Sequence, residues 1–317
     1  MIWRRIGSRL LALIPILLAS SVVVFFTLNL VPGSAASAFL GNQQTQATIA
    51  AFNHRYGLDR PLVVQYFDWV THAIHGDFGL SLQSQDAVGP QVLSRIPVTL
   101  ELAVLGMFAA LLIGLPLGII AATRRGKRTD IVLSVVAVAG MSIPNFVIAT
   151  ALVLVVALDL GLVPVGGYVP FTEDPVQNLE LLLLPSIALG LGPSTILFRI
   201  MRSSMLEVLE SDYVRTARAK GVSFQMVIIR HAFRNAVIPF LTVAGLEFAG
   251  LFGGAVIIEQ IFLIPGLGSY VFTAIEGRDY FVLLASIMTM TTVVVLVNAF
   301  VDIAAIFIDP RKASGAE

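Results

Sequence analysis

The sequence has 317 residues, of which 57% are apolar and 13% charged, with no net charge and no cysteine. Soluble domains contain about 25% charged residues, so this composition indicates an all-α membrane protein that crosses the bilayer several times. The absence of cysteine excludes disulfides, thiolate metal sites and cysteine nucleophiles, and the neutral balance gives no indication of nucleic-acid binding.

Six stretches are long and apolar enough to cross a membrane, which takes about 20 apolar residues. They are Leu10–Val31, Val98–Thr123, Ile131–Leu158, Leu181–Met201, Ala236–Ile264 and Val282–Ile308. The first follows three arginines and resembles a secretory signal, but it is longer than the roughly 7–15 apolar residues of a signal core. We therefore expect a retained first span and six transmembrane helices.

The distribution of positive charge predicts the orientation of these spans. If both ends of the chain are inside, only Arg55, Arg60, Arg95 and Arg278 of the 20 Lys and Arg residues fall outside. Lys and Arg in short loops remain on the cytoplasmic side of a membrane. We therefore expect an N-in, C-in topology.

The first outer loop, residues 32–97, is long enough to fold, and Thr48–Tyr56 and Pro61–His75 both have helical patterns. In the second of these, the apolar residues near one face are Leu62, Val63, Tyr66, Phe67, Val70 and Ile74. This pattern predicts an interfacial helix with Tyr66 and Trp69 at the level of the lipid headgroups.

Proline and glycine interrupt several spans and are expected to loosen or bend them. These positions are Gly114-Leu-Pro116-Leu-Gly118, Ile143-Pro144-Asn145, Pro185 and Gly190-Leu-Gly192-Pro193. For each one alone, close helix packing is the alternative to a bend that serves transport.

The longest basic stretch between two spans is Asp212–Asn235, here called the basic segment. Its basic residues are Arg215, Arg218, Lys220, Arg230, Arg234 and the potentially charged His231. We expect two short helices, with Gly221 as a left-handed stop after the first and Ser223 as the cap of the second. Pro239 suits the first turn of the next membrane helix. From the residues alone, binding to anionic lipid headgroups remains open as the role of this charge.

The basic segment resembles the cytoplasmic "EAA" loop of bacterial ABC-importer permeases, in particular the peptide-type branch. Tyr213–Gly221 reads YVRTARAKG and Arg230–Pro239 reads RHAFRNAVIP, which closely match the pattern of that branch. The founding Glu-Ala-Ala is replaced by Arg-Thr-Ala at 215–217. The resemblance continues through HGDFGLSL, the turn Pro265–Gly268 and VNAFVDIAAIFIDPR, whereas the Pro32-Gly33 turn lacks the usual Asp-Pro after it.

This resemblance implies a type I ABC-importer permease with six transmembrane helices in a bacterial inner membrane. Its parts would be a first span at 1–31, an extracytoplasmic subdomain at 32–97 and a core at 98–317 with a coupling loop at 202–235. The implied partners are a second homologous permease, two ATPase subunits that bind ATP and Mg, an extracytoplasmic binding protein and membrane lipid. The residues implied to contact the ATPases are Tyr213, Arg215, Ala217, Arg218, Ala219, Lys220, Gly221, Arg230, His231 and Asn235.

Ionisable side chains inside spans are costly and mark candidate functional sites. Glu101, Glu247, Glu259 and Asp302 are of this kind, and Asn298 shares a helix face with Asp302. We expect Glu247, Glu259, Asn298 and Asp302 to line a translocation pathway, with hydrogen bonding between helices as the alternative.

Sequence signatures of catalysis are missing. The chain has no G-x-x-x-x-G-K-[ST], H-E-x-x-H or G-x-S-x-G motif, and His72 with His75 gives too few ligands for a metal. We therefore expect a non-catalytic transport subunit without a cofactor of its own. Peptides are the expected substrate, with nickel, glutathione or another small solute as alternatives. An intramembrane hydrolase and a secondary transporter leave the basic segment unexplained.

Overall fold

The computed structural model describes residues 2–30, 35–40 and 44–308, and these residues form helices joined by short loops. The long helices are α1 (Ile2–Leu30), α5 (Val88–Thr123), α8 (Pro175–Glu210), α11 (Arg234–Ile261) and α13 (Tyr280–Ile308). Among the described residues, five helices are long and apolar enough to cross a membrane, or six if one bent pair counts as a single span. The predicted all-helical class is confirmed.

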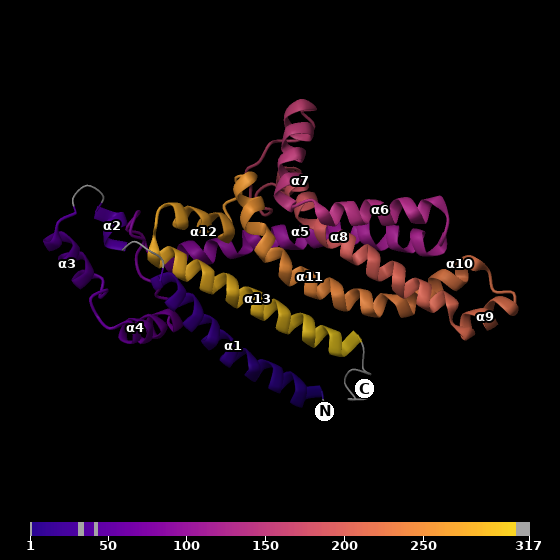
Figure 1. Cartoon of the computed structure of the whole chain (residues 1–317), viewed down its shortest axis with the longest axis horizontal. Helices are drawn as coiled ribbons and strands as arrows, with labels where there is room; N and C mark the ends of the chain where they lie inside the picture. The colour runs from indigo at the N-terminus through magenta and orange to yellow at the C-terminus, as the bar shows by residue number, and fades with distance from the viewer. Residues whose placement is uncertain (1, 31–34, 41–43, 309–317) are drawn as a thin grey trace.

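The centre of the molecule is the packing of α5 against α8, with α11 alongside (Figure 1). Glycines let the backbones approach closely at this contact. A Cβ added to Gly114 would lie 2.6 Å from the Ser194 carbonyl oxygen, and one added to Gly118 would lie 2.7 Å from the Met201 Cβ. These predicted small-residue positions therefore serve packing. Both helices continue through their internal prolines.

The first span packs on the last one rather than on the centre. Helix α13 lies between α1 and α11 (Figure 1). At the end of α1 that carries Arg9, an ion pair joins Arg9 to Asp302 of α13. At the other end, Ser21 of α1 lies 2.7 Å from the Tyr66 hydroxyl.

The predicted span Ile131–Leu158 is a broken helix. Helix α6 (Arg128–Ser142) ends before Pro144, and α7 (Asn145–Leu152), continued by the π-helix η2 (Val153–Asp159), starts in a direction bent by 100°. Proline disfavours helical geometry in the residue before it, and Ile143 is extended. The predicted bend at Ile143-Pro144-Asn145 is confirmed, and the two helices together pass as one bent span. Helix α7 projects from the bundle (Figure 1).

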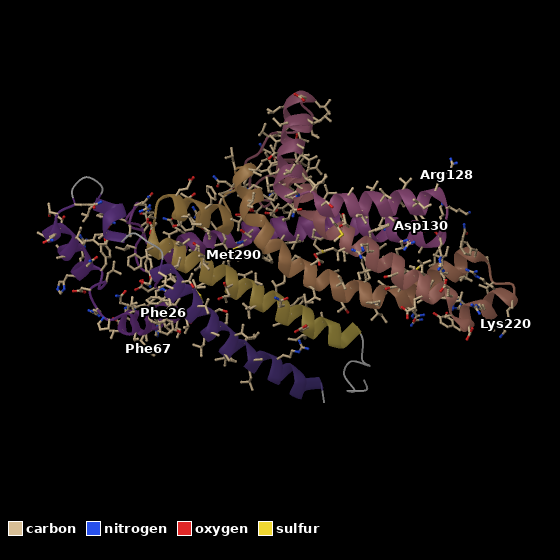
Figure 2. All side chains as sticks on the ribbon, viewed as in Figure 1. Phe26, Phe67, Arg128, Asp130, Lys220 and Met290 are labelled. Carbon is tan, nitrogen blue, oxygen red and sulfur yellow. The ribbon has the colours of Figure 1, made fainter. Side chains whose placement is uncertain are left out.

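The long first loop folds at the end of the molecule opposite the basic segment, as Phe67 and Lys220 show in Figure 2. It contains α2 (Ala35–Leu40), α3 (Gln46–Arg55) and α4 (Leu62–Ile74), so both predicted helices are confirmed and α2 was not foreseen. Tyr66 of α4 is buried, while Phe67 is exposed, so the predicted apolar face divides between packing and surface. The Pro32-Gly33 turn lies outside the described residues.

Helix α12 (Leu267–Glu276) connects this end of α11 to α13. The turn before α13 is fixed by Asp279, whose carboxylate accepts a hydrogen bond of 2.6 Å from the Ser81 hydroxyl. The Gln83 side chain donates to the Gly277 carbonyl oxygen at 2.9 Å. The first-loop subdomain is therefore attached to the C-terminal half of the chain by specific polar contacts.

Candidate functional site

The basic segment begins with α9 (Asp212–Ala219), which ends in a defined C-terminal cap. The Gly221 N–H donates to the Arg218 carbonyl at 2.9 Å, and the Val222 N–H donates to the Ala217 carbonyl at 3.2 Å. This pair of bonds is the Schellman motif, which requires a left-handed residue after the cap. Gly221 has φ of 80°, so its predicted role as a left-handed stop is confirmed.

The second half of the segment departs from prediction in its details. Ser223 occupies the N-cap position of α10 (Phe224–Met226), but its side chain makes no capping hydrogen bond. A π-helix, η3 (Val227–Phe233), then continues directly into α11. Pro239 therefore lies inside α11 rather than in the first turn of a new helix, and that prediction is wrong.

The segment is held to the bundle through its apolar side. Val214, Val227 and Ala232 have no exposed surface. Asn235 joins the two halves, since its side-chain amide donates to the Tyr213 hydroxyl and to the His231 carbonyl, each at 2.9 Å. The two halves therefore form one small folded unit at the end of α8 and the beginning of α11.

The outer side of this unit combines positive charge with exposed apolar surface. The exposed basic residues are Arg215, Arg218, Lys220, Arg230 and Arg234. The exposed large apolar residues are Tyr213, Phe224, Met226 and Ile229. The Arg218 guanidinium lies 5.3 Å from the centre of the Phe224 ring. The unit is at the extreme end of the molecule, where Lys220 is labelled in Figure 2, so it is available to a large partner.

Of the four predicted pathway residues, Glu247 borders a cavity at the break between α6 and α7. The cavity measures about 280 Å³ and is also lined by Ile143, Asn145, Gly192 and Gly254. A Cβ on Gly192 would lie 3.1 Å from Asn145 Oδ1, so glycine makes room for the Asn145 side chain. Asn145 was not predicted as a site residue, although its position directly after the helix-breaking proline was noted.

Glu259 is fully buried, and it joins helices rather than lining a pathway. The Thr99 hydroxyl of α5 donates to its carboxylate at 2.6 Å, and the Ser269 N–H of α12 donates at 2.9 Å. The Leu267 N–H donates to Thr99 Oγ1 at 2.8 Å. Glu259 therefore caps the first turn of α12, where a carboxylate is favourable; these contacts are the hydrogen bonding between helices that was the alternative to a pathway role.

The cavity beside Glu247 is not lined by Asp302, Asn298 or Glu101. Asp302 pairs with Arg9, and Asn298 is half-buried on α13. Glu101 accepts a hydrogen bond of 2.7 Å from Tyr168. Burial, together with the hydrogen bond to Glu101, raises the pKa of Tyr168 to about 12. The structure does not bring the four predicted pathway residues together.

The described residues hold no group of three His, Asp or Glu side chains placed to bind a metal. His72 and His75 each direct Nδ1 at a backbone carbonyl of the preceding turn, at 2.7 Å. The side chains of these histidines therefore form hydrogen bonds with the backbone of α4.

Comparison with known proteins gives matches along the whole chain. Residues 114–314 match the family described as "Binding-protein-dependent transport system inner membrane component", and residues 2–103 match the N-terminal region of such components. The chain is 38% identical to the dipeptide transport system permease protein DppB of Alkalihalophilus pseudofirmus, covering 96% of this chain and 97% of the relative. It is 39% identical to the glutathione transport system permease protein GsiC of Salmonella choleraesuis, covering 96% of each.

A solved structure has a similar fold. Chains of the MetNI methionine ABC transporter in inward-facing conformations superpose with a TM-score of 0.58 at 16% identity, covering 69% of this chain and 96% of that chain. This likeness concerns the fold alone.

Proposed function

Because the chain belongs to the family of binding-protein-dependent transport system inner membrane components, we propose that it forms half of an ATP-driven import pathway for di- or oligopeptides. The observation that carries this proposal is the similarity over 96% of the chain to a dipeptide permease. The chain is a multi-pass inner-membrane protein of the peptide-type ABC permeases. Its substrate, its partners and its sidedness are the parts that are proposed.

The other half of the pathway is a second, homologous permease. The features that support this are the projection of α7 from the bundle and its uncovered apolar surface. Phe146, Val147, Leu154, Val155 and Leu158 are each more than 40% exposed. An apolar surface of this kind faces either lipid or another protein, and the cavity beside Glu247 is bounded by the same broken span.

The basic segment is the contact for the ATPase subunits, which hold ATP and Mg. Three features of the segment support this role: its exposed charge, its exposed aromatic and aliphatic side chains, and the capped, folded form of α9. Since the segment lies between α8 and α11, a shift of it moves the ends of two helices of the central bundle. Closure of the ATPases would thus alter the cavity at the broken span. The broken span is then the element with two conformations, and nucleotide binding shifts the balance between them.

The substrate enters from an extracytoplasmic binding protein that contacts the first-loop subdomain. Peptides and glutathione both carry amide groups with charged ends, and relatives named for each are 38–39% identical to this chain. The Glu247 cavity offers one carboxylate and the Asn145 amide. These two groups suit polar solutes and do not select one peptide.

The test is uptake by the complex purified through a tag on this chain and reconstituted with its binding protein. We expect ATPase subunits to copurify and ATP-dependent uptake of radiolabelled dialanine, with glutathione and Ni²⁺ as the competing substrates. The isolated chain is expected to hydrolyse no ATP. Copurification without any ATPase, or ATP-independent uptake, would contradict the proposal.

A further inference from the structure

Two ion pairs connect α8 to the start of α6 and to the short loop before it. Arg125 pairs with Glu210 on the surface, where both side chains are 59% exposed. Arg202 pairs with Asp130; the Asp130 side chain is only 5% exposed and that of Arg202 is 30% exposed, so the carboxylate is the buried member of what is here called the buried pair. Both pairs lie at the same end of the molecule as Lys220, as the labels of Arg128 and Asp130 show in Figure 2. Helix α8 thus carries one exposed pair to the loop and one largely buried pair to α6.

The buried pair has a fixed geometry. Arg202 Nε donates to Asp130 Oδ1 at 2.6 Å, and Arg202 Nη2 donates to Oδ2 at 3.0 Å. The Gly126 N–H donates to Oδ2 at 3.0 Å. A two-pronged guanidinium–carboxylate contact sets orientation as well as distance, which a lysine cannot reproduce. Asp130 is therefore held by three donors from two elements.

Burial argues that this pair serves more than stability. Moving two charges out of water offsets much of their attraction, so buried ion pairs add little net stability and are better attested where they fix register. Asp130 lies in the first turn of α6, and Arg202 lies where α8 runs on to Glu210 and then to α9 at Asp212. The pair therefore connects α8, which precedes the basic segment, to α6, which ends at the break before Pro144.

We propose that Asp130 and Arg202 are positioning residues that transmit movement of the basic segment through α8 to α6, and so to the broken span beside the Glu247 cavity. This inference rests on the proposed function. Movement of α8 by itself is transmitted to the centre of the bundle. The ion pair makes the start of α6 move together with α8. Without the pair, ATP hydrolysis continues while the cavity responds less.

The test uses the full reconstituted complex and measures substrate taken up per ATP hydrolysed. Asp130→Asn and Arg202→Lys each remove the two-pronged ion pair with little change in volume. We expect each to lower uptake per ATP roughly tenfold or more while the ATPases still copurify, because Asp130→Asn leaves the Arg202 charge without its partner and Arg202→Lys keeps the charge but not the two-pronged geometry. The exchange variant Asp130→Arg with Arg202→Asp is expected to restore part of the coupling.

The matched control is Arg125→Gln, which breaks the exposed pair between the neighbouring loop and α8. Exposed ion pairs contribute little, so uptake per ATP should stay within about twofold of the unaltered complex. Normal coupling in both buried-pair variants overturns the inference. So does loss of assembly in both, because the pair is then purely structural. Failure of the unaltered complex to transport would instead refute the proposed function.

Discussion

The Asn235 side-chain amide donates a hydrogen bond of 2.9 Å to the Tyr213 hydroxyl, which joins the first turn of α11 to α9. Asn235 also holds the His231 carbonyl at 2.9 Å. A single side chain therefore connects the helix that would contact a partner to a helix of the central bundle. Movement of α9 can pass to α11 through this contact.

Removing this hydrogen bond should weaken coupling without unfolding the chain. Tyr213→Phe and Asn235→Ala each delete a partly exposed bond worth about 0.5–1.5 kcal/mol, so uptake should fall about two- to tenfold. The double variant should be no worse than the more severe single one, because both act on one contact. Additive losses would show that the two residues act separately.

Glu259 is predicted to matter for stability rather than for transport. Glu259→Ala leaves the Thr99 hydroxyl and the Ser269 N–H buried without their acceptor, at a cost of about 1–3 kcal/mol for each group. The expected result is a lower thermal midpoint of the purified protein in detergent. Glu276→Ala, on the exposed surface of α12, is the control and should leave the midpoint unchanged. A stable Glu259→Ala protein with altered transport would restore the pathway role.

The contact between α5 and α8 predicts which glycines tolerate a methyl group. Gly118→Ala places a Cβ 2.7 Å from the Met201 Cβ and should destabilise the bundle by about 1–3 kcal/mol. Gly253→Ala, in α11 with nothing within 4 Å of the added Cβ, should be neutral or stabilising because alanine favours helix. Thermal unfolding compares the two variants directly. Equal midpoints would contradict the close contact between α5 and α8 at Gly118.

Sidedness follows from the charge distribution and can be tested in intact cells, since the chain has no cysteine of its own. Asp68 on α4 and Thr216 on α9 are both exposed and lie towards opposite ends of the molecule. Asp68→Cys should react with an impermeant maleimide from outside, and Thr216→Cys should react only after the membrane is opened. Labelling of both from outside would contradict the predicted topology.

Much of this architecture could be predicted because it depends on local chemistry. Apolar length predicts the spans, Pro144 predicts the break, and Gly221 predicts the end of α9. The direction of α7 could not be predicted, because a helix-breaking dipeptide does not specify an angle of 100°. The continuation of η3 into α11 was not predicted. Pro239 was expected in the first turn of a new helix, but it lies inside α11, which has already begun at Arg234.

The candidate site was harder to predict where it depends on tertiary contacts. A carboxylate in a span is compatible with a pathway or with a cap, and only the fold brings Thr99 and Ser269 to Glu259. Asp130 was not predicted as a site residue, because a carboxylate next to a basic loop resembles an ordinary surface charge. Its partner, Arg202, is distant in the sequence, and the buried pair forms only when α6 packs on α8.

We propose that the basic segment couples this chain to ATPase subunits, and substitutions at Gly221 give the sharpest test of that role. The Gly221 φ of 80° with nothing within 4 Å of an added Cβ means that backbone conformation alone requires glycine. Gly221→Val should cost about 1–2 kcal/mol at the cap, whereas Gly221→Asn should be tolerated, because asparagine adopts this conformation more readily. Ala217→Trp adds bulk one turn earlier on α9.

The measurement is uptake by the reconstituted complex together with the amount of ATPase that copurifies with each variant. We expect Gly221→Val and Ala217→Trp to abolish uptake and to lose ATPase while the chain remains inserted and folded, and we expect Gly221→Asn to keep both uptake and ATPase. Normal uptake with a full complement of ATPase in both Gly221→Val and Ala217→Trp would contradict the coupling role, and binding to anionic lipid would then account for the charge of the segment.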